Sequence, residues 1–303
     1  MYVSGIALLL EVRHYETIVA IVELGTMTKA AKELASTQST LSHRLAEAER
    51  RLGQRLFDRG PGRRLTPTRA GLVAHQAASR ALADLERGEA LVLAEDDRVT
   101  AIVRIAVGSY DCYHWYPDFL RATRARHPEI DLELVVVGDE PGTALASGAA
   151  DLVIAPGDPA GNVTTYHLFQ DELVLVVGAD HPLASKQWVA AEQLVDETYL
   201  TYNSAPTPGF EYDRFIRPSG SYPSTVKVVQ QTSAITELVA AGAGVSVLSR
   251  WALSPAVDSG RIVPVSCGPK GLALQWNAVL RAGEPADYPA NKVSKLLAKH
   301  LAA

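Results

Sequence analysis

The chain has 303 residues, 47% of them hydrophobic, which is enough for two or three domains with well-packed cores. Two cysteines are too few for a disulfide framework, which argues against a small secreted scaffold. The sequence has no uninterrupted run of about 18 apolar residues that could span a membrane. A short apolar run at residues 6–10 lacks the basic start of a signal peptide and ends at Glu11. We therefore expect a cytoplasmic protein without a membrane partner.

Charge is distributed unevenly along the chain. The net charge of −5 argues by itself against a nucleic-acid partner. Residues 1–70, however, carry 11 Lys and Arg against 7 Asp and Glu, a net charge of +4, whereas the remainder carries 18 against 27, a net charge of −9. A basic N-terminal part on an acidic body suits contact with DNA through one end of the molecule.

The N-terminal 66 residues predict a helical domain in which two short helices cross closely. Thr28 is the predicted N-cap of the first, which ends near Leu34 and carries small residues that let another helix pass nearby. The second begins near Thr37 or Gln38. It has one apolar stripe, formed by Leu41, Leu45, Ala48 and Leu52.

The other face of the second helix is polar at its N-terminus and has a cation one turn further on. Its side chains are Gln38, Ser39, Thr40, Ser42, His43 and Arg44. Amide, hydroxyl and imidazole groups can read base edges in the major groove, and an arginine can bind phosphate or guanine. An ordinary amphipathic hairpin with a solvated polar face is the alternative for these residues alone. We expect the first four polar side chains and His43 to face DNA and Arg44 to contact its backbone.

The segment that follows predicts a β-hairpin. Residues 56–59 form an apolar strand, residues 60–62 a Gly-Pro-Gly turn, and residues 63–66 the returning strand. A hairpin next to two crossing helices is a wing. We expect Arg63 and Arg64 at its tip to contact the DNA backbone, together with Thr28.

Three motifs in this region carry a family resemblance. They are A-A-x-x-L from Ala30, Q-S-x-L-S from Gln38, and E-x-x-L-G-x-x-L-F-x-R from Glu49. The region resembles the DNA-binding domain of LysR-type transcriptional regulators, although Ala48 stands where that family usually has Leu. The resemblance implies a sequence-specific transcriptional regulator whose DNA binding responds to a small-molecule effector. It also implies double-stranded promoter DNA and further copies of the chain, in a homodimer or homotetramer, as partners, with RNA polymerase a further candidate.

A long helix follows the wing. Thr66 and Pro67 are the predicted N-cap and first helical residue, and the helix reaches about Asp96. One alternative is that this helix packs on its own domain. A helix of about 30 residues, however, spans roughly 45 Å and would extend beyond a small domain. We expect it to pair with a second copy, as the family's long helix does. The predicted contact seam consists of Ala74, Ala78, Ala81, Leu85, Gly88 and Val92.

From residue 102 onward, strands alternate with helices, which predicts a largely parallel sheet covered by helices. Two rounds of alternation predict two lobes, lobe I at about 102–170 and 266–303 and lobe II at about 171–265. This part resembles the LysR effector domain, which is similar in fold to periplasmic solute-binding proteins. The matching motifs are ADLVI at 150–154, VLVVGADHPLA at 174–184 and VAAGAGVSVLSR at 239–250. The expected fold is therefore α/β with a helical head: a winged helix-turn-helix domain (1–66), a dimerising linker helix (67–98) and a bilobed effector-binding domain (102–303).

Ligands of open α/β sheets bind at the carboxyl ends of strands, where helix N-termini point their amides into a crevice. The expected effector-binding residues lie at such positions. They are Ser109, Tyr110, Asp111, Cys112, His114, Pro156, Tyr202, Asn203, Ser204, Gln231, Thr232 and Ser233. Helix N-termini favour a carboxylate and an inward-facing Asp111 favours an amine, which together suggest a zwitterion such as an amino acid. The alternative, that Asp111 caps the helix after its loop, stays open.

One stretch points to a branch of the family. Residues 109–120, SYDCYHWYPDFL, resemble the corresponding loop of LysR-type regulators of methionine biosynthesis, with Cys112 and Trp115 at matching places. This resemblance points towards a sulfur-containing amino acid as the effector.

The remaining motifs predict neither a cofactor or metal site nor a catalytic site. Gly242-Ala243-Gly244 follows a helix instead of preceding one, so it predicts a helix end and not a dinucleotide site. Cys112 and Cys267 could form a redox pair, but their spacing does not demand it. No metal-ligand spacing occurs, and no nucleophile motif accompanies Asp111 and His114. We expect no cofactor, no metal and no catalytic residue. The alternative functions are a cytosolic enzyme with an appended helical domain and an architectural DNA binder without an effector.

Overall fold

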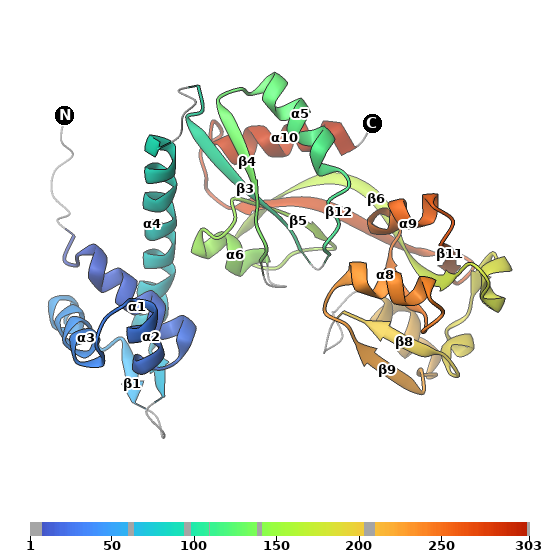
Figure 1. Cartoon of the computed structure of the whole chain (residues 1–303), viewed down its shortest axis with the longest axis horizontal. Helices are drawn as coiled ribbons and strands as arrows, with labels where there is room; N and C mark the ends of the chain where they lie inside the picture. Colours follow the sequence, from blue (N-terminus) through green and yellow to red (C-terminus); the bar gives the residue numbers. More distant parts are fainter. Residues whose placement is uncertain are drawn as a thin grey trace. The chain divides into compact units, whose positions relative to one another are not determined.

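The computed structural model describes residues 8–59, 64–93, 98–108, 110–137, 141–202 and 210–301. The chain divides into two compact units, Met1–Asp97 with Ala146–Ala149, and Arg98–Leu145 with Ala150–Ala303 (Figure 1). Within the described residues, no helix is both long enough and apolar enough to cross a membrane.

The first unit begins with three helices around a small apolar core. They are α1 (Val12–Leu24), α2 (Met27–Glu33) and α3 (Gln38–Leu52). Gly25 ends α1 with a φ of 72°, and Thr37 caps α3 by accepting a hydrogen bond from the backbone N–H of Thr40 at 3.1 Å. The predicted N-cap of α2 was wrong. Thr26 is extended and accepts from the backbone of Lys29, whereas Thr28 already lies in the first helical turn.

A wing of two antiparallel strands follows, β1 (Phe57–Arg59) and β2 (Leu65–Pro67). Glu49 explains one part of the sequence motif, because its carboxylate accepts from the backbone N–H groups of Leu56 and Phe57 at 2.8 and 3.3 Å. The wing tip, with the predicted turn at 60–62 and Arg63, lies outside the described residues.

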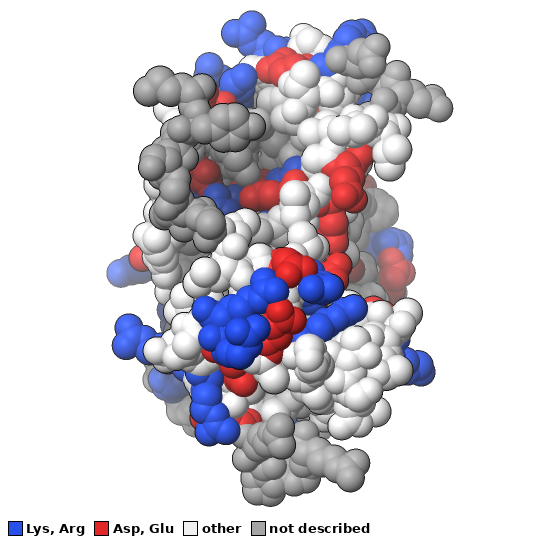
Figure 2. Space-filling model, turned by 90° about the vertical axis from the view of Figure 1, so that its left-hand side faces the viewer, with Lys and Arg blue, Asp and Glu red and all other residues white. Residues whose placement is uncertain are grey.

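The long helix α4 (Arg69–Leu93) starts later than predicted. Pro67 belongs to β2, where it pairs with Phe57, so Thr68 takes over the cap and accepts from Gly71 N at 3.1 Å. Gly71 sits so close to the wing that a Cβ there would lie 2.0 Å from the carbonyl oxygen of Leu56. The side of the molecule with α1 and α3 gathers Lys and Arg side chains with some Asp and Glu among them (Figure 2).

The second unit is built on a mixed sheet, so the prediction of a largely parallel sheet was wrong in part. The described strands follow the order β4-β3-β5-β12-β6-β11-β7, with β10 also on β6. Their bounds are β3 (Ala101–Val107), β4 (Ile130–Leu134), β5 (Leu152–Pro156), β6 (Val163–Gly178), β7 (Trp188–Val189), β10 (Ser246–Ser249), β11 (Ile262–Cys267) and β12 (Leu272–Arg281). The sheet is parallel across β4, β3 and β5, but β12 returns from the C-terminal part of the chain and pairs antiparallel with both β5 and β6.

Strand β6 joins the two lobes. Its residues 163–173 pair with β12, and its residues 173–178 pair with β10 and β11. The helices of lobe I are α5 (Tyr116–Arg126), α6 (Pro141–Ser147) and α10 (Pro289–Leu301). Lobe II adds a parallel strand pair, β8 (Thr198–Thr201) with β9 (Thr225–Val228), and the helices α7 (Arg217–Ser219), α8 (Thr232–Ala240) and α9 (Ser254–Asp258) (Figure 1).

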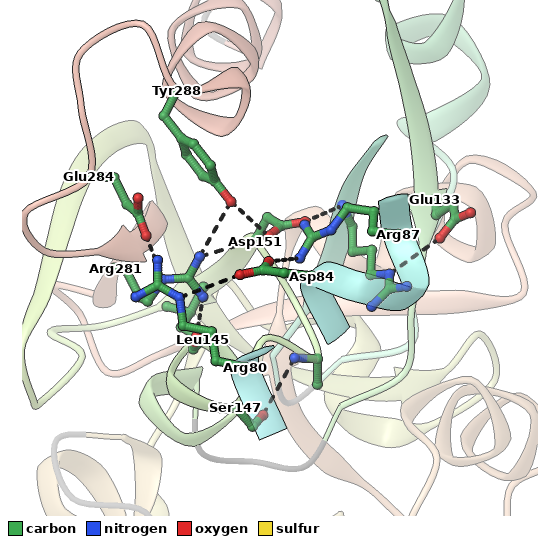
Figure 3. A network of polar contacts seen from close by, with 12 residues as sticks. Arg80, Asp84, Arg87, Glu133, Leu145, Ser147, Asp151, Arg281, Glu284 and Tyr288 are labelled. Carbon is green, nitrogen blue, oxygen red and sulfur yellow. Dashed lines mark hydrogen bonds and ion pairs between the residues drawn. The ribbon is translucent and has the colours of Figure 1, made fainter. Parts of the chain in front are cut away.

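A buried polar network holds lobe I together at the end of β12 (Figure 3). Arg281 donates to Glu284 at 2.7 Å and to the carbonyl oxygen of Leu145 in α6 at 2.5 Å. Asp151, almost fully buried before β5, accepts from the hydroxyl of Tyr288 at 3.2 Å and from the backbone of Arg104 at 3.0 Å. A buried carboxylate needs such partners, which gives Asp151 of the ADLVI motif a structural role.

Candidate DNA-binding face and effector cavity

The exposed face of α3 is polar, as the sequence predicts. Leu41, Leu45 and Ala48 are buried against α1 and α2, which leaves the opposite side of the helix to solvent. The predicted DNA-binding residues on that side are all exposed; they are Gln38, Ser39, Thr40, Ser42 and His43. The helix therefore presents hydrogen-bonding groups on a rigid support.

Two threonines near the starts of α2 and α3 make hydrogen bonds to side chains of this face. The Thr37 hydroxyl lies 2.9 Å from that of Ser39 and 2.8 Å from that of Thr40. The hydroxyl of Thr28 donates to Gln38 Oε1 at 3.5 Å, a long hydrogen bond that leaves the amide N–H groups of Gln38 available. Thr28, expected on the DNA backbone, thus also orients a side chain expected to read bases.

The structure describes two of the cations that we expect to bind the DNA backbone. Arg44 is half-buried and makes no ion pair with another described residue. Arg64 is exposed at the base of the wing, where its backbone bridges to Thr26.

A charged cluster that the sequence analysis missed fixes α3 to the start of α1. Glu47 binds Arg51 at 2.5 Å, and Arg51 also reaches Glu11 at 2.9 Å. The guanidinium of Arg51, and next the ring of His14, lower the pKa of Glu47. His14 is fully buried, and its Nδ1 accepts from the backbone of Glu11 at 3.0 Å. The spacing of Glu47 and Arg51, four residues apart on a helix, was the signal available in the sequence.

In the second unit, Asp111 joins a loop of lobe I to the first turn of α8 in lobe II. Its Oδ1 accepts from the backbone N–H of Ser233 at 2.9 Å, and its two oxygens also accept from the hydroxyls of Thr232 and Ser233. Burial acts to raise the pKa of Asp111, but the hydrogen bonds from Ser233 and Thr232 outweigh it and the pKa is lowered. Asp111 thus caps a helix, but a different one from the helix that follows its own loop.

A cavity of about 240 Å³ adjoins this contact. It unites six of the predicted effector-binding residues, Tyr110, Asp111, Cys112, His114, Thr232 and Ser233. The lining residues that were missed include Thr236, Glu237 and Arg261, of which the last two form a bidentate pair at 2.7 and 2.9 Å. Leu248, Leu253 and Ala256 supply apolar lining.

The other predicted effector-binding residues do not line this cavity or are not described. Pro156 ends β5 opposite Trp276, and Gln231 precedes α8 without capping it through its side chain. The ring of Tyr202 packs 5.5 Å from that of Tyr110, whose hydroxyl accepts from Ser249 N. Ser109, Asn203 and Ser204 lie outside the described residues.

Neither cysteine is poised for reaction. Burial raises the pKa of the Cys112 and Cys267 thiols to about 12 each, so both are protonated at neutral pH. The Gly242-Ala243-Gly244 stretch ends α8 and leads into β10, as the order of elements predicts. Among the described residues, no group of three or more His, Cys, Asp or Glu side chains is arranged to hold a metal ion.

Comparison with known proteins decides the family. Residues 12–72 match the bacterial regulatory helix-turn-helix of the LysR family, and residues 96–302 match the LysR substrate-binding domain. The chain belongs to the LysR family of transcriptional regulators. Its relatives include the transcriptional regulator MetR of Salmonella typhimurium and of Escherichia coli. Each is 32% identical over 279 residues, covering 91% of this chain and 86% of the relative.

Solved structures agree with this assignment. The regulatory domain of MetR from Neisseria meningitidis is 27% identical, covers 66% of this chain and 93% of its own, and superposes with a TM-score of 0.53. Full-length CbnR, a LysR-family regulator, shares the fold over 97% of this chain and 98% of its own, with 20% identity and a TM-score of 0.63. This LysR-family chain is therefore a DNA-binding transcriptional regulator with an effector-binding domain, and its named relatives are regulators.

Proposed function

We propose that this LysR-family regulator recognises promoter DNA with the polar face of α3 and the wing. Gln38, Ser39, Thr40 and His43 serve base edges, and Thr28, Arg44, Arg63 and Arg64 serve the backbone. The observation that carries the proposal is the exposed polar face of α3, supported from behind by a buried apolar stripe. CbnR, a member of the same family, has been solved in complex with its target DNA.

Selection of DNA fragments by the purified full-length protein tests this proposal. We expect a defined motif to be enriched, because base-edge contacts in the major groove discriminate among all four base pairs. Enrichment of DNA without a shared motif would instead favour the architectural binder, and no retention at moderate salt would contradict DNA binding by this face.

We further propose that the cavity beside Asp111 binds a small zwitterion such as an amino acid. The sequence suggested that the N-terminus of α8 takes the carboxylate, but that position is filled by Asp111. Arg261 in the cavity wall provides a cation for a carboxylate, and Asp111 with Glu237 provides acids for an amine. The resemblance of residues 109–120 to regulators of methionine biosynthesis also favours an amino acid, and sulfur-containing amino acids are the first to test.

Calorimetry with the full-length protein separates the alternatives. An amino acid should bind the wild type, and acetylation of its amine or the Arg261→Gln change should each weaken binding. Thr236→Ala should have a smaller effect, because it removes a neutral hydroxyl from the same cavity. Equal binding of a plain dicarboxylate by the wild type and by Asp111→Asn would contradict the zwitterion while leaving the cavity as the site.

We also propose that an enzymatic role is absent. Cys112 and His114 both line the cavity, but the pKa of the thiol is raised and no hydrogen bond joins these two described residues, so Cys112 is not activated as a nucleophile by His114. Turnover of any bound amino acid by the purified protein would contradict this proposal.

A further inference from the structure

A shallow hollow with a volume of about 510 Å³ lies beside α3. Five of its lining residues belong to α3, namely Ser39, Thr40, His43, Arg44 and Glu47, and the sixth is Arg13 of α1. Three of the α3 residues are also part of the proposed base-reading face. The hollow is therefore continuous with that face, and Arg13 is the residue that another helix contributes to it.

Arg13 is free to change its partner. Its side chain is 51% exposed, and its guanidinium lies 2.8 Å from the carboxylate of Glu11. The other oxygen of Glu11 lies 2.9 Å from Arg51. If Arg13 turned to a different anion, Glu11 would therefore keep a cation, and exposed ion pairs of this kind contribute little to stability.

Two other charged side chains near the hollow, Arg51 and Glu47, already have partners. Arg51 donates to the carbonyl oxygen of Leu9 at 3.1 Å as well as to Glu11 and Glu47, so it is held in place. Glu47 is compensated by Arg51, and its second oxygen lies 3.4 Å from Nε2 of His14. An anion entering the hollow would thus meet two available cations, Arg13 and Arg44.

We propose that Arg13 binds a phosphate of the DNA backbone in this hollow, together with Arg44. The inference rests on the proposed docking of α3 on DNA, and it extends the contact surface to the first helix of the chain. A phosphate matches the forked N–H groups of a guanidinium, and it is present at every nucleotide whatever the base. Arg13 would therefore fix the position of α3 along the DNA without reading its sequence.

The test measures DNA affinity against salt for full-length wild type, Arg13→Ala and Arg13→Lys, with a duplex that the wild type selects. Each phosphate contact contributes about 0.9 to the slope of log affinity against log salt. Arg13→Ala should reduce that slope by about one and weaken all sequences alike, and Arg13→Lys should keep most of the slope. Arg55→Ala is the matched control, because Arg55 is also an exposed arginine of this domain and does not line the hollow.

A second measurement locates the contact. A series of duplexes is prepared, each with one backbone phosphate replaced by a neutral methylphosphonate. One of these replacements should weaken DNA binding by the wild type but not by Arg13→Ala. An unchanged slope for Arg13→Ala, an equal loss for Arg55→Ala, or additive losses at every methylphosphonate would overturn the inference. Failure of the wild type to bind any duplex would instead overturn the proposed role of α3.

Discussion

The backbone N–H of Ser233 donates to Oδ1 of Asp111 across 2.9 Å, although the two residues are 122 positions apart in the sequence. The contact joins the loop after β3 in lobe I to the first turn of α8 in lobe II. Tyr110 reinforces it from the neighbouring position, because its hydroxyl accepts from Ser249 N at 3.1 Å. A change in the distance between the lobes would have to break these hydrogen bonds. The effector that we propose for the adjoining cavity would therefore act beside this contact.

Asp111→Asn should destabilise the second unit. The charged carboxylate satisfies N–H and hydroxyl donors at a helix N-terminus, and losing such a cap costs about 0.5–2 kcal/mol of unfolding free energy. Urea unfolding followed by tryptophan fluorescence measures this, since all four tryptophans lie in that unit. The exposed Asp287 is the control, and Asp287→Asn should leave the midpoint unchanged. Equal midpoints for wild type and Asp111→Asn would contradict the capping role.

The same contact predicts a pH dependence. The pKa of Asp111 is lowered in the folded protein, so its stabilising effect is complete above the ordinary pKa of about 3.9 and is lost as the pH falls through the folded value. The difference in unfolding free energy between wild type and Asp111→Asn should therefore be constant from about pH 5 to 8 and shrink in more acidic solution. A difference that grew on acidification would contradict this assignment.

Gln38→Ala should relax base preference at one position of the binding site. A side-chain amide that contacts a base edge contributes about 1–3 kcal/mol of discrimination there. Binding-site selection with the variant measures the effect, and Lys32→Ala, an exposed change at the end of α2, serves as the control. If the Gln38 variant returned the wild-type motif, direct reading of a base by Gln38 would be wrong.

Leu85→Asp should reduce the size of the assembly. Leu85 and Val92 are 52% and 85% exposed on α4, and with Ala81 and Gly88 they form an apolar stripe on the described subunit. A carboxylate in a helix-helix contact would lack a partner. Light scattering should show smaller particles for Leu85→Asp but not for Leu72→Asp, which is equally exposed but lies off the stripe. An unchanged mass would place the dimer contact elsewhere.

Two glycines of α4 should respond oppositely to alanine. Gly71→Ala puts a methyl group against the carbonyl of Leu56 and should cost about 1–3 kcal/mol, because the wing must shift. Gly88 has open space around it within the described subunit, so Gly88→Ala should raise the unfolding free energy of the subunit by about 0.5–1 kcal/mol through better helix propensity. Thermal unfolding followed by circular dichroism distinguishes them, and destabilisation of equal size would contradict the steric argument.

The N-terminal domain was the most predictable part of the chain, because its signals are local. Leu41, Leu45 and Ala48 recur at helical spacing, and Thr37 precedes them as a cap, so the start of α3 follows from adjacent residues. Misplaced caps arose where two threonines lie close together. Thr26 and Thr68 took the roles assigned to Thr28 and Thr66 because strand pairing and backbone conformation decide which threonine stands at a helix start.

The sequence by itself determined the alternation of strands and helices, the polar face of α3 and the loop that carries Asp111, since each depends on residue periodicity or on the chemistry of a few neighbours. Only the tertiary structure decided what Asp111 binds, that Glu237 and Arg261 share its cavity, and that β12 returns antiparallel between β5 and β6. Such contacts join residues far apart in the chain. Their partners are selected by the packing of whole elements, which no local pattern of side chains encodes.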